Sequence, residues 1–546
     1  MDSLHSKLAL IGGKVYTPFG FREALLIEGE RISFVGNSVD AEVLANREFE
    51  RINLDGRTVI PGLCDSHLHF IAWASNADKL DLKGSKSIND VRKKLIKFVS
   101  NPNYADFTDN SWIEGRGWNQ ELFETDSQKM PTRYDIDDIV PNIPTVLSRV
   151  CGHVGVINSA AINKLGINSD TVVSGGIIDL GADGKPNGII RESALELVWN
   201  NIPSLTYEDL SHLLHKYGKI AASFGLTTLN SDDLSELNDD YERAIYFYSK
   251  AECEGKMPFR LRQQFLLRTH QQLREFLAKG WRTGMGSKKY KIGPLKILCD
   301  GSLGGRTALL REDYVDEPGS IGIPIHSQED LDEFVWLAHS SGTQVAMHAI
   351  GDAALDMCLN SVEKARKSRI NSLRHIIVHC QIADDFQLLR LKQLGMGAAV
   401  QPCFVPSDRE MAIKRLGYNK ASHSYRWKTM IDKGIIISAG SDAPVESISP
   451  LFGIHAAVTR QDENGRPYGG WGEKERLSVA QAINMYTWAS AWHANEENIR
   501  GEIVEGKLAD LVILEDDIFA TAQERIKDIR VSMTICGGNI TYKRLP

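Results

Sequence analysis

Short apolar runs alternate with amphipathic stretches through most of this 546-residue chain, and this alternation restricts the fold more than any other feature. Amphipathic periodicity recurs over residues 88–99, 207–223, 327–339 and 384–394. Between these stretches lie short runs rich in β-branched and apolar residues. Strands that alternate with helices favour a parallel sheet covered by helices. We therefore predict an α/β fold.

Nine apolar runs are candidate strands, one more than the eight strands of a (β/α)8 TIM-like barrel. They end near His67, Val150, Ser231, Leu267, Asp300, His348, His379, Gln401 and Asp442. The connection from about residue 71 to residue 220 is too long for an ordinary link between barrel strands. We therefore assign the run that ends at Val150 to an insertion at about 71–220, within a barrel domain over residues 58–502.

Both ends of the chain have a different texture, in which short strand patterns follow one another with turns between them. Such patterns occupy residues 1–57 and recur over residues 503–546. We predict that the two ends together form one small β-sandwich domain.

The net charge of −8 comes without a long cluster of Lys or Arg, which argues against nucleic acid or an anionic membrane surface as a partner. Residues 1–17 lack the charged start and long apolar core of a secretory signal, and no apolar run approaches the ~18 residues that span a bilayer. We expect a cytoplasmic protein that acts on a small molecule, with a homodimer as the default assembly.

The eight cysteines are scattered, with no Cys-x-x-Cys pair. This spacing argues against a zinc knuckle or a disulfide framework. We expect reduced thiols that serve mainly as small buried hydrophobic residues.

The strongest local motif is the apolar run from Val59 that ends in His67-Leu-His69. In a strand, residues i and i+2 point to the same face, so both imidazoles can reach one metal ion. A His-x-His pair alone is commonplace on protein surfaces. Its place at the end of an apolar strand, where barrel active sites lie, favours a metal site.

Lys296 lies inside the apolar run Gly293-Pro-Leu-Lys-Ile-Leu-Cys. Because a buried ammonium is costly to desolvate, we expect this side chain to be paired, deprotonated or chemically altered. Carbamylation by carbon dioxide would convert it into an anionic ligand able to bridge two metals. The alternative is an ion pair of Lys296 with Asp300 or a similar acid.

Three further apolar runs end in His348, His379 and Asp442. Taken singly, each histidine has an ordinary alternative as a hydrogen-bonded core residue, and Asp442 as the N-cap of the next helix. Imidazole and carboxylate donors at the ends of four strands, with Lys296 on a fifth, together indicate a metal site at one mouth of a barrel.

This order of strand-end ligands resembles that of the amidohydrolase superfamily. Longer phrases resemble its branch that contains the N-substituted formamide deformylases, and the likeness covers nearly the whole chain. These phrases are Gly115-Arg-Gly-Trp118-Asn, Cys151-Gly-His153, Asn158-Ser-Ala-Ala, Asp300-Gly-Ser-Leu-Gly-Gly-Arg306-Thr-Ala, His348-Ala-Ile-Gly-Asp, Gln401-Pro and Gly440-Ser-Asp-Ala-Pro-Val-Glu.

The resemblance implies a site for one or two divalent ions, with zinc the first choice. The expected ligands of one ion are His67, His69, carbamylated Lys296 and Asp442, and those of the second are Lys296, His348 and His379. Asp442 would also act as general base and acid. Trp118, His153 and Arg306 are candidates for substrate contact, and nearby Trp112 and Phe123 hint at an apolar substrate group.

The chain departs from the pattern of this branch at one strand. Relatives tend to carry Arg-His-Arg-Ile-Glu-His, whereas this chain reads Arg374-His-Ile-Ile-Val-His379. Alternation along the strand predicts that Ile376 and Val378 point away from the ligand His379.

The implied function is hydrolysis of a carbon–nitrogen bond in a small amide, such as an N-substituted formamide. A lactonase or an aromatic-base deaminase of the same superfamily is the alternative enzyme. Mononuclear deaminases need no bridging lysine, so Lys296 weighs against that version. A non-catalytic barrel is a third alternative, which the retained set of ligands disfavours.

Overall fold

The computed structural model describes residues 7–101, 111–124, 129–151 and 153–545; Gly152 of the Cys151-Gly-His153 phrase lies outside these ranges. The chain forms two compact units. One contains residues 1–72 and 207–546, and the other contains residues 73–206. The second unit, residues 73–206, lies within the insertion expected at about 71–220.

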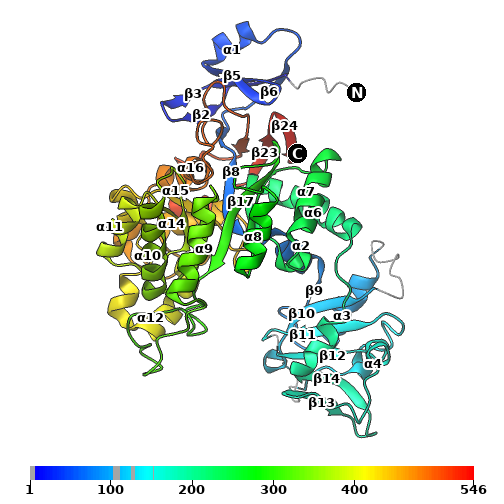
Figure 1. Ribbon diagram of the computed structural model, residues 1–546. Coiled ribbons are helices and arrows are strands. Elements are labelled where there is room, and N and C mark those ends of the chain that lie inside the picture. Colours follow the sequence, from blue (N-terminus) through cyan, green and yellow to red (C-terminus); the bar gives the residue numbers. More distant parts are fainter. Residues whose placement is uncertain (1–6, 102–110, 125–128, 152, 546) are drawn as a thin grey trace. The chain divides into compact units, whose positions relative to one another are not determined.

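The first unit contains an eight-stranded parallel sheet that curls into a barrel (Figure 1). Its strands are β8 (Leu63–Leu68), β15 (Leu226–Asp232), β16 (Arg260–Leu266), β17 (Tyr290–Leu298), β18 (Val345–Ala349), β19 (Ile376–His379), β20 (Gly397–Val400) and β21 (Ile437–Ala439). Their lateral order follows the sequence, as repeated strand–helix–strand links predict. The predicted α/β barrel is confirmed.

Hydrogen bonds beyond the last and first strands draw the two edges of the barrel together. The amide of Asp442 donates to the carbonyl of His67 at 2.8 Å, and the amide of His69 donates to the carbonyl of Ala443 at 2.8 Å. These residues follow β21 or end β8, so the closure lies at the mouth formed by the carboxyl ends of the strands.

The helices that link the strands cover the barrel (Figure 1). They are α6 (Tyr207–Ser223), α7 (Tyr241–Cys253), α8 (His270–Ala278), α9 (Gln328–Ser340), α10 (Asp352–Ser368), α11 (Asp385–Gln393), α12 (Phe404–Ser422), α13 (Trp427–Asp432), α14 (Pro450–Thr459), α15 (Val479–Met485) and α16 (Trp488–His493). The amphipathic stretches predicted from the sequence are helices, and local chemistry fixes where two of them start. Ser327 caps α9, and Asp384 with Gln387 forms a capping box on α11.

Strands from both ends of the chain form two further sheets in the first unit. A four-stranded sheet has the order β5-β4-β1-β6, and a six-stranded sheet has the order β24-β23-β22-β7-β2-β3. The strands are β1 (Lys7–Ile11), β2 (Lys14–Thr17), β3 (Gly20–Arg22), β4 (Ala24–Glu28), β5 (Arg31–Gly36), β6 (Glu50–Asn53), β7 (Thr58–Pro61), β22 (Leu511–Leu514), β23 (Val531–Cys536) and β24 (Asn539–Lys543), and α1 (Ser38–Leu44) follows β5.

The two terminal sheets share one apolar core. Leu10 and Leu25 of the smaller sheet pack in the same buried cluster as Val59, Leu511 and Ile535 of the larger sheet. The predicted β-sandwich from both termini is therefore confirmed. Because β7 leads directly into β8, the sandwich also anchors the first barrel strand and the histidines at its end.

The second unit is built on its own six-stranded sheet, of order β13-β14-β12-β11-β10-β9. Its elements are β9 (Leu80–Asp81), α3 (Ile88–Val99), β10 (Ile113–Trp118), β11 (Thr145–Arg149), β12 (Val154–Ile157), α4 (Ser159–Leu165), β13 (Gly176–Leu180), β14 (Pro186–Glu192) and α5 (Glu196–Trp199), and α2 (Phe70–Asp78) leads into it. The ninth candidate strand is β11, so its assignment outside the barrel agrees with the structure.

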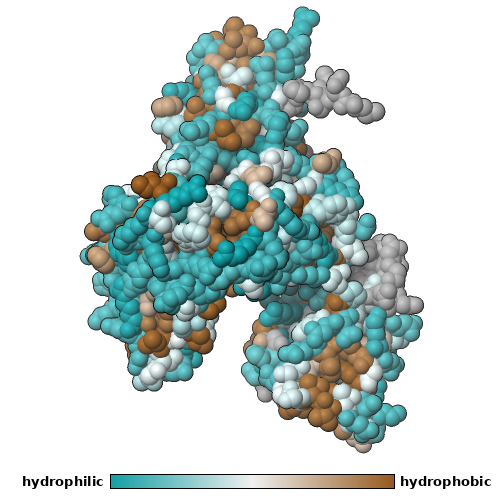
Figure 2. Space-filling view, viewed as in Figure 1, coloured by the Kyte–Doolittle hydropathy of each residue, from teal (hydrophilic) through white to brown (hydrophobic). Residues whose placement is uncertain are grey.

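Hydrophilic residues cover most of the face seen in Figure 2, and hydrophobic residues appear there in separate patches. Six of the eight cysteines are buried, while Cys151 and Cys253 are exposed, and all are free thiols. Among the described residues, no helix is long and apolar enough to cross a membrane.

Candidate metal centre

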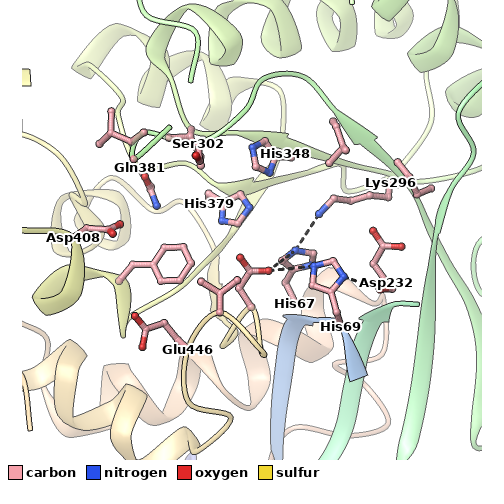
Figure 3. A pocket seen from close by; sticks show the side chains of 18 of the residues that line it. His67, His69, Asp232, Lys296, Ser302, His348, His379, Gln381, Asp408 and Glu446 are labelled. Atoms are coloured by element: carbon pink, nitrogen blue, oxygen red, sulfur yellow. Dashed lines mark hydrogen bonds and ion pairs between the residues drawn. The ribbon is translucent and has the colours of Figure 1, made fainter. Parts of the chain in front are cut away.

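A cavity of about 490 Å³ opens at the carboxyl ends of the barrel strands (Figure 3). Its lining includes every side chain that the sequence singled out as a ligand. These are His67, His69, Lys296, His348, His379 and Asp442. Residues separated by hundreds of positions thus meet in one space, because each lies near the carboxyl end of a strand of the same barrel or just after it.

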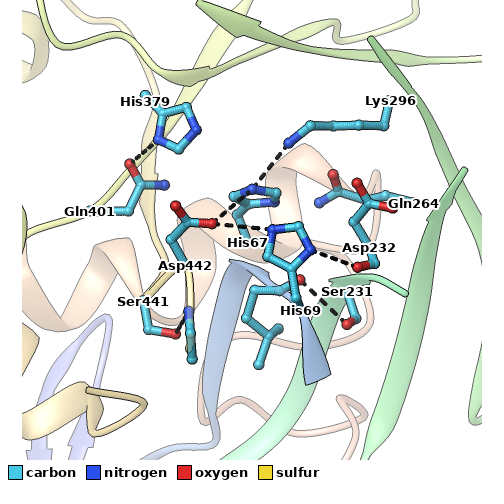
Figure 4. Close-up of polar contacts among 12 residues, drawn as sticks. His67, His69, Ser231, Asp232, Gln264, Lys296, His379, Gln401, Ser441 and Asp442 are labelled. Carbon is cyan, nitrogen blue, oxygen red and sulfur yellow. Dashed lines mark hydrogen bonds and ion pairs between the residues drawn. The ribbon is translucent and has the colours of Figure 1, made fainter. Parts of the chain in front are cut away.

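His67, His69 and Asp442 form the tightest group of donors (Figure 4). Their ligand atoms all lie within 4.8 Å of one another. The Asp442 carboxylate is 3.3 Å from His67 Nε2 and 3.4 Å from His69 Nε2. One cation between these three atoms would be reached by all of them after small movements, and two imidazoles with one carboxylate suit a divalent transition metal.

Lys296 is buried on β17 with its ammonium nitrogen aimed at the same group. Its Nζ lies 3.0 Å from His67 Nε2, and burial lowers the pKa of Lys296. The Lys296–Asp300 ion pair considered from the sequence is not formed. The Asp300 carboxylate instead accepts backbone N–H bonds at 2.8–3.1 Å from Leu309, Ile350 and Gly351.

His348 and His379 form the other side of the group, with ring centroids 4.5 Å apart. In each ring, one nitrogen forms a hydrogen bond to a residue outside the group of candidate ligands. His348 Nε2 donates to the Gly301 carbonyl at 3.1 Å, and His379 Nδ1 donates to Gln401 Oε1 at 2.8 Å. Such bonds fix the ring and leave the opposite nitrogen available as a ligand.

Burial lowers the pKa of the His67, His348 and His379 imidazoles, to about 3 at His67 and about 4 at His348, and favours their neutral forms. At His69 burial also lowers the pKa, but the hydrogen bond with Asp442 outweighs it and raises the pKa to about 9, so His69 must lose its proton before it binds a metal. Burial opposes ionisation of Asp442, yet hydrogen bonds from His67 and His69 hold the pKa of this carboxyl well below its usual value. Neutral imidazole and ionised carboxylate are the protonation states that metal ligation requires.

Asp442 does not cap the next helix, which was its alternative role. Helix α14 begins at Pro450 and is capped by Ser449. The position of Asp442 is set by Asp65, which the sequence analysis did not single out. The Asp65 carboxylate accepts hydrogen bonds from the amide of His67 and from the amide and hydroxyl of Ser441.

Strand β19 differs from the expectation drawn from alternation. Val378 pairs laterally with His348, and paired residues of neighbouring parallel strands share a face. Ile376 and Val378 therefore lie on the His348 face, where they form a buried cluster with alanines of the adjacent strands. His379 has a left-handed φ of 73°, which breaks the pleat and lets its ring line the cavity too. The expectation that both apolar residues point away from the ligands is wrong.

The three candidate substrate contacts lie in different parts of the chain. In the second unit, Trp118 is fully buried and its indole N–H donates to the Leu147 carbonyl at 2.8 Å, while His153 is exposed beside Glu192. In the first unit, Arg306 pairs with Asp316 at 2.9 Å. Trp112 and Phe123 are also buried in apolar clusters of the second unit. Substrate contact by these residues stays a prediction.

Several cavity residues had no recognisable signal in the sequence. The segments that follow the barrel strands carry Gln381, Phe404, Asp408 and Glu446. Local sequence patterns do not indicate where the side chains of such segments point. Asp232 is the exception, because it is an acid at the very end of β15 and lies one residue beyond the expected strand end.

A (β/α)8 barrel with histidines and an aspartate converging at its mouth defines the class of metal-dependent hydrolases. The chain belongs to the Amidohydrolase family, whose profile matches residues 50–542. It is 34% identical to YtcJ of Bacillus subtilis (strain 168) over 98% of this chain and 99% of that protein.

Two further relatives agree with this placement. The N-substituted formamide deformylase of Arthrobacter pascens is 26% identical over 96% of this chain and 95% of its own length. The crystal structure of an uncharacterized metal-dependent hydrolase from Pyrococcus furiosus superposes with a TM-score of 0.77 at 29% identity, covering 94% of this chain and 100% of that chain.

Proposed function

We propose that this protein hydrolyses a carbon–nitrogen bond of a small amide, with an N-substituted formamide as the first substrate class to test. The observation that carries the proposal is the convergence of His67, His69 and Asp442 donor atoms within 4.8 Å, beside a buried lysine. The similarity to an N-substituted formamide deformylase supports the bond class.

The donor set fits two divalent ions, with zinc as the proposed metal. His67, His69 and Asp442 would hold one ion, and His348 and His379 the other. A carbamylated Lys296 would bridge them, since its buried amine faces His67 from the opposite strand. A neutral amine is the form that reacts with carbon dioxide, and burial favours that form.

Bound divalent metal would supply an acidified water and a polarised substrate carbonyl. In this reaction the role of the chain's own residues is to bind the proton and transfer it. The Asp442 carboxylate accepts the proton of the attacking water at Oδ1 or Oδ2 and delivers it to the leaving nitrogen. The Asp65 carboxylate accepts hydrogen bonds from the His67 amide and the Ser441 hydroxyl, which ties the residue before Asp442 to the strand that carries His67 and so helps to position Asp442.

The alternative functions differ in the chemical state that they predict for Lys296. A mononuclear deaminase would leave Lys296 as an unmodified amine, whereas a lactonase would use the same ligands on an ester bond. The buried position of Lys296 beside His67 favours a binuclear site over a mononuclear one. The similarity to an N-substituted formamide deformylase favours an amide over a lactone.

The test compares zinc-loaded protein, chelator-treated protein and His67→Ala with N-benzylformamide, measuring formate release. We expect release only from the zinc-loaded wild type. Release that persists after the chelator removes all metal would refute the metal-dependent mechanism. Turnover of a lactone panel, with none of any amide, would assign the lactonase function instead.

A further inference from the structure

The end of the cavity away from Lys296 carries two carboxylates that the proposed reaction does not use. Asp408 lies on α12, and Glu446 lies in the segment after β21. Figure 3 shows both on the opposite side of the histidines from Lys296. They are close enough to interact, because the charge of Glu446 contributes to the raised pKa of Asp408.

Within the part of the chain that the structure describes, neither carboxylate has a basic partner. Asp408 accepts a hydrogen bond from the Tyr425 hydroxyl at 2.8 Å, and Glu446 accepts one from Ser407. Arg268 also lines the cavity, but its guanidinium is held by Asp239 at 2.9 and 3.2 Å. Two partly buried negative charges are therefore left uncompensated, which is costly unless a cation joins them.

Gln381 presents a second kind of polar group to the same cavity. Its side chain is 3% exposed, and its Oε1 is approached by the Tyr425 hydroxyl at 3.4 Å. Among the described residues, no acceptor meets the amide Nε2, which faces the cavity between the histidines and Asp408 (Figure 3). The Gln381 Nε2 donor is therefore open to the cavity, where a bound ligand or water can accept its hydrogen bond.

The wall between the metal centre and the two carboxylates is apolar. The Phe404 ring stacks on His379, with centroids 6.1 Å apart and planes 8° apart. Met411 and Val445 line the same cavity. An aromatic or aliphatic group could lie along this wall, with an amide at the histidines and a charged group at the carboxylates.

We propose that Asp408 and Glu446 bind a protonated nitrogen, an ammonium or guanidinium group, on the far end of the substrate. The enzyme would then prefer amides whose substituent carries a positive charge. The preference in catalysis rests on the proposed amide hydrolysis, whereas the binding of the cation does not.

Two probes isolate the charge. 4-(Aminomethyl)benzamide and 4-methylbenzamide share the ring and the amide and differ only in an ammonium in place of a hydrogen. Isothermal titration calorimetry on the zinc-loaded protein should show at least about tenfold tighter binding of the ammonium probe, equivalent to about 1.4 kcal/mol. Asp408→Asn and Glu446→Gln should each shrink this ratio, and the double variant should abolish it.

Glu410→Gln is the matched control, because Glu410 is an exposed acid on the same helix. The ratio should be unchanged in this variant. Equal binding of the two probes to the wild type would overturn the proposal, as would a ratio that survives in the double variant. Hydrolysis of the amide bond is measured separately: a charge preference without turnover refutes only the proposed function, and turnover without a preference refutes only this inference.

Discussion

Asp442 and His67 are joined twice, once through the backbone and once through their side chains. The Asp442 amide donates to the His67 carbonyl at 2.8 Å, while the Asp442 carboxylate lies 3.3 Å from His67 Nε2. The first bond helps close the barrel between its last and first strands, and the second contact sets the spacing of two candidate metal ligands. Assembly of the candidate metal centre is therefore coupled to closure of the barrel.

Replacing His67 tests the metal centre directly. His67→Ala removes a donor from the group of three, so the purified variant should bind less than half the zinc of the wild type, as measured by elemental analysis after dialysis. His212→Ala, which changes an exposed histidine on α6, is the control and should keep the full zinc content. Equal zinc in all three proteins would contradict the assignment.

Gln401 is expected to act as a positioning residue for His379. Since its Oε1 accepts the Nδ1 proton at 2.8 Å, Gln401→Leu frees the ring and should weaken zinc binding about 10- to 100-fold. Gln401→Glu keeps an acceptor at that place and should restore most of the affinity. Zinc titration with a competing chromophoric chelator measures both; unchanged affinity in the leucine variant would exclude the role.

Lys296 should carry a carbamate in the zinc-loaded protein. Growth or incubation with carbon-13 bicarbonate should give a carbamate resonance in the NMR spectrum of the wild type, because burial beside His67 lowers the pKa of this amine and so favours the neutral form that reacts with carbon dioxide. Lys296→Gln should lack the resonance. A wild-type spectrum without it, at full zinc occupancy, would favour the mononuclear alternative.

Glu496 is predicted to stabilise the fold outside the active site. Its carboxylate pairs with Lys291 at 2.7 Å and Arg500 at 2.6 Å, so Glu496→Gln should cost about 3–5 kcal/mol of unfolding free energy. The exposed Glu463→Gln should change it by no more than about 0.5 kcal/mol. Urea unfolding at neutral pH measures both variants.

The same glutamate predicts a pH dependence. Burial raises the pKa of Glu496, but Arg500, Arg262 and Lys291 outweigh it and lower the pKa on balance. A folded-state pKa below the unfolded value of about 4.3 gives stability that is present above that pH and lost below it. The difference between wild type and Glu496→Gln should therefore shrink as the pH falls below about 4. A difference that grows under acid would contradict this sign.

The preference for a cationic probe should also depend on pH. Burial raises the pKa of Asp408 to about 6, with Glu446 adding to the shift. Asp408 is thus protonated below that pH and ionised above it, so the tighter binding of the ammonium probe should fall as the pH drops from 7 to 5. In Asp408→Asn this part of the pH dependence should disappear.

The ends of the barrel strands were predictable because each carries a local signal. An apolar run that stops at His348 or at Asp442 marks both the strand and the side chain at its mouth. The inward turn of His379 was not predictable, since it depends on a left-handed backbone at one residue and not on alternation. The direction of Ile376 and Val378 follows instead from the lateral pairing of β19 with β18.

By itself, the sequence determined which residue types end the strands, and these predicted the fold class and the candidate metal ligands. Apolar periodicity and polar strand ends are properties of short segments, so they can be recognised in the sequence alone. Only the tertiary structure decided how the segments after the strands face the cavity. Asp408, Glu446 and Gln381 became neighbours of the metal centre through the packing of α12 and the strand-end segments around the barrel mouth. Such encounters depend on contacts between distant residues, which no local pattern records.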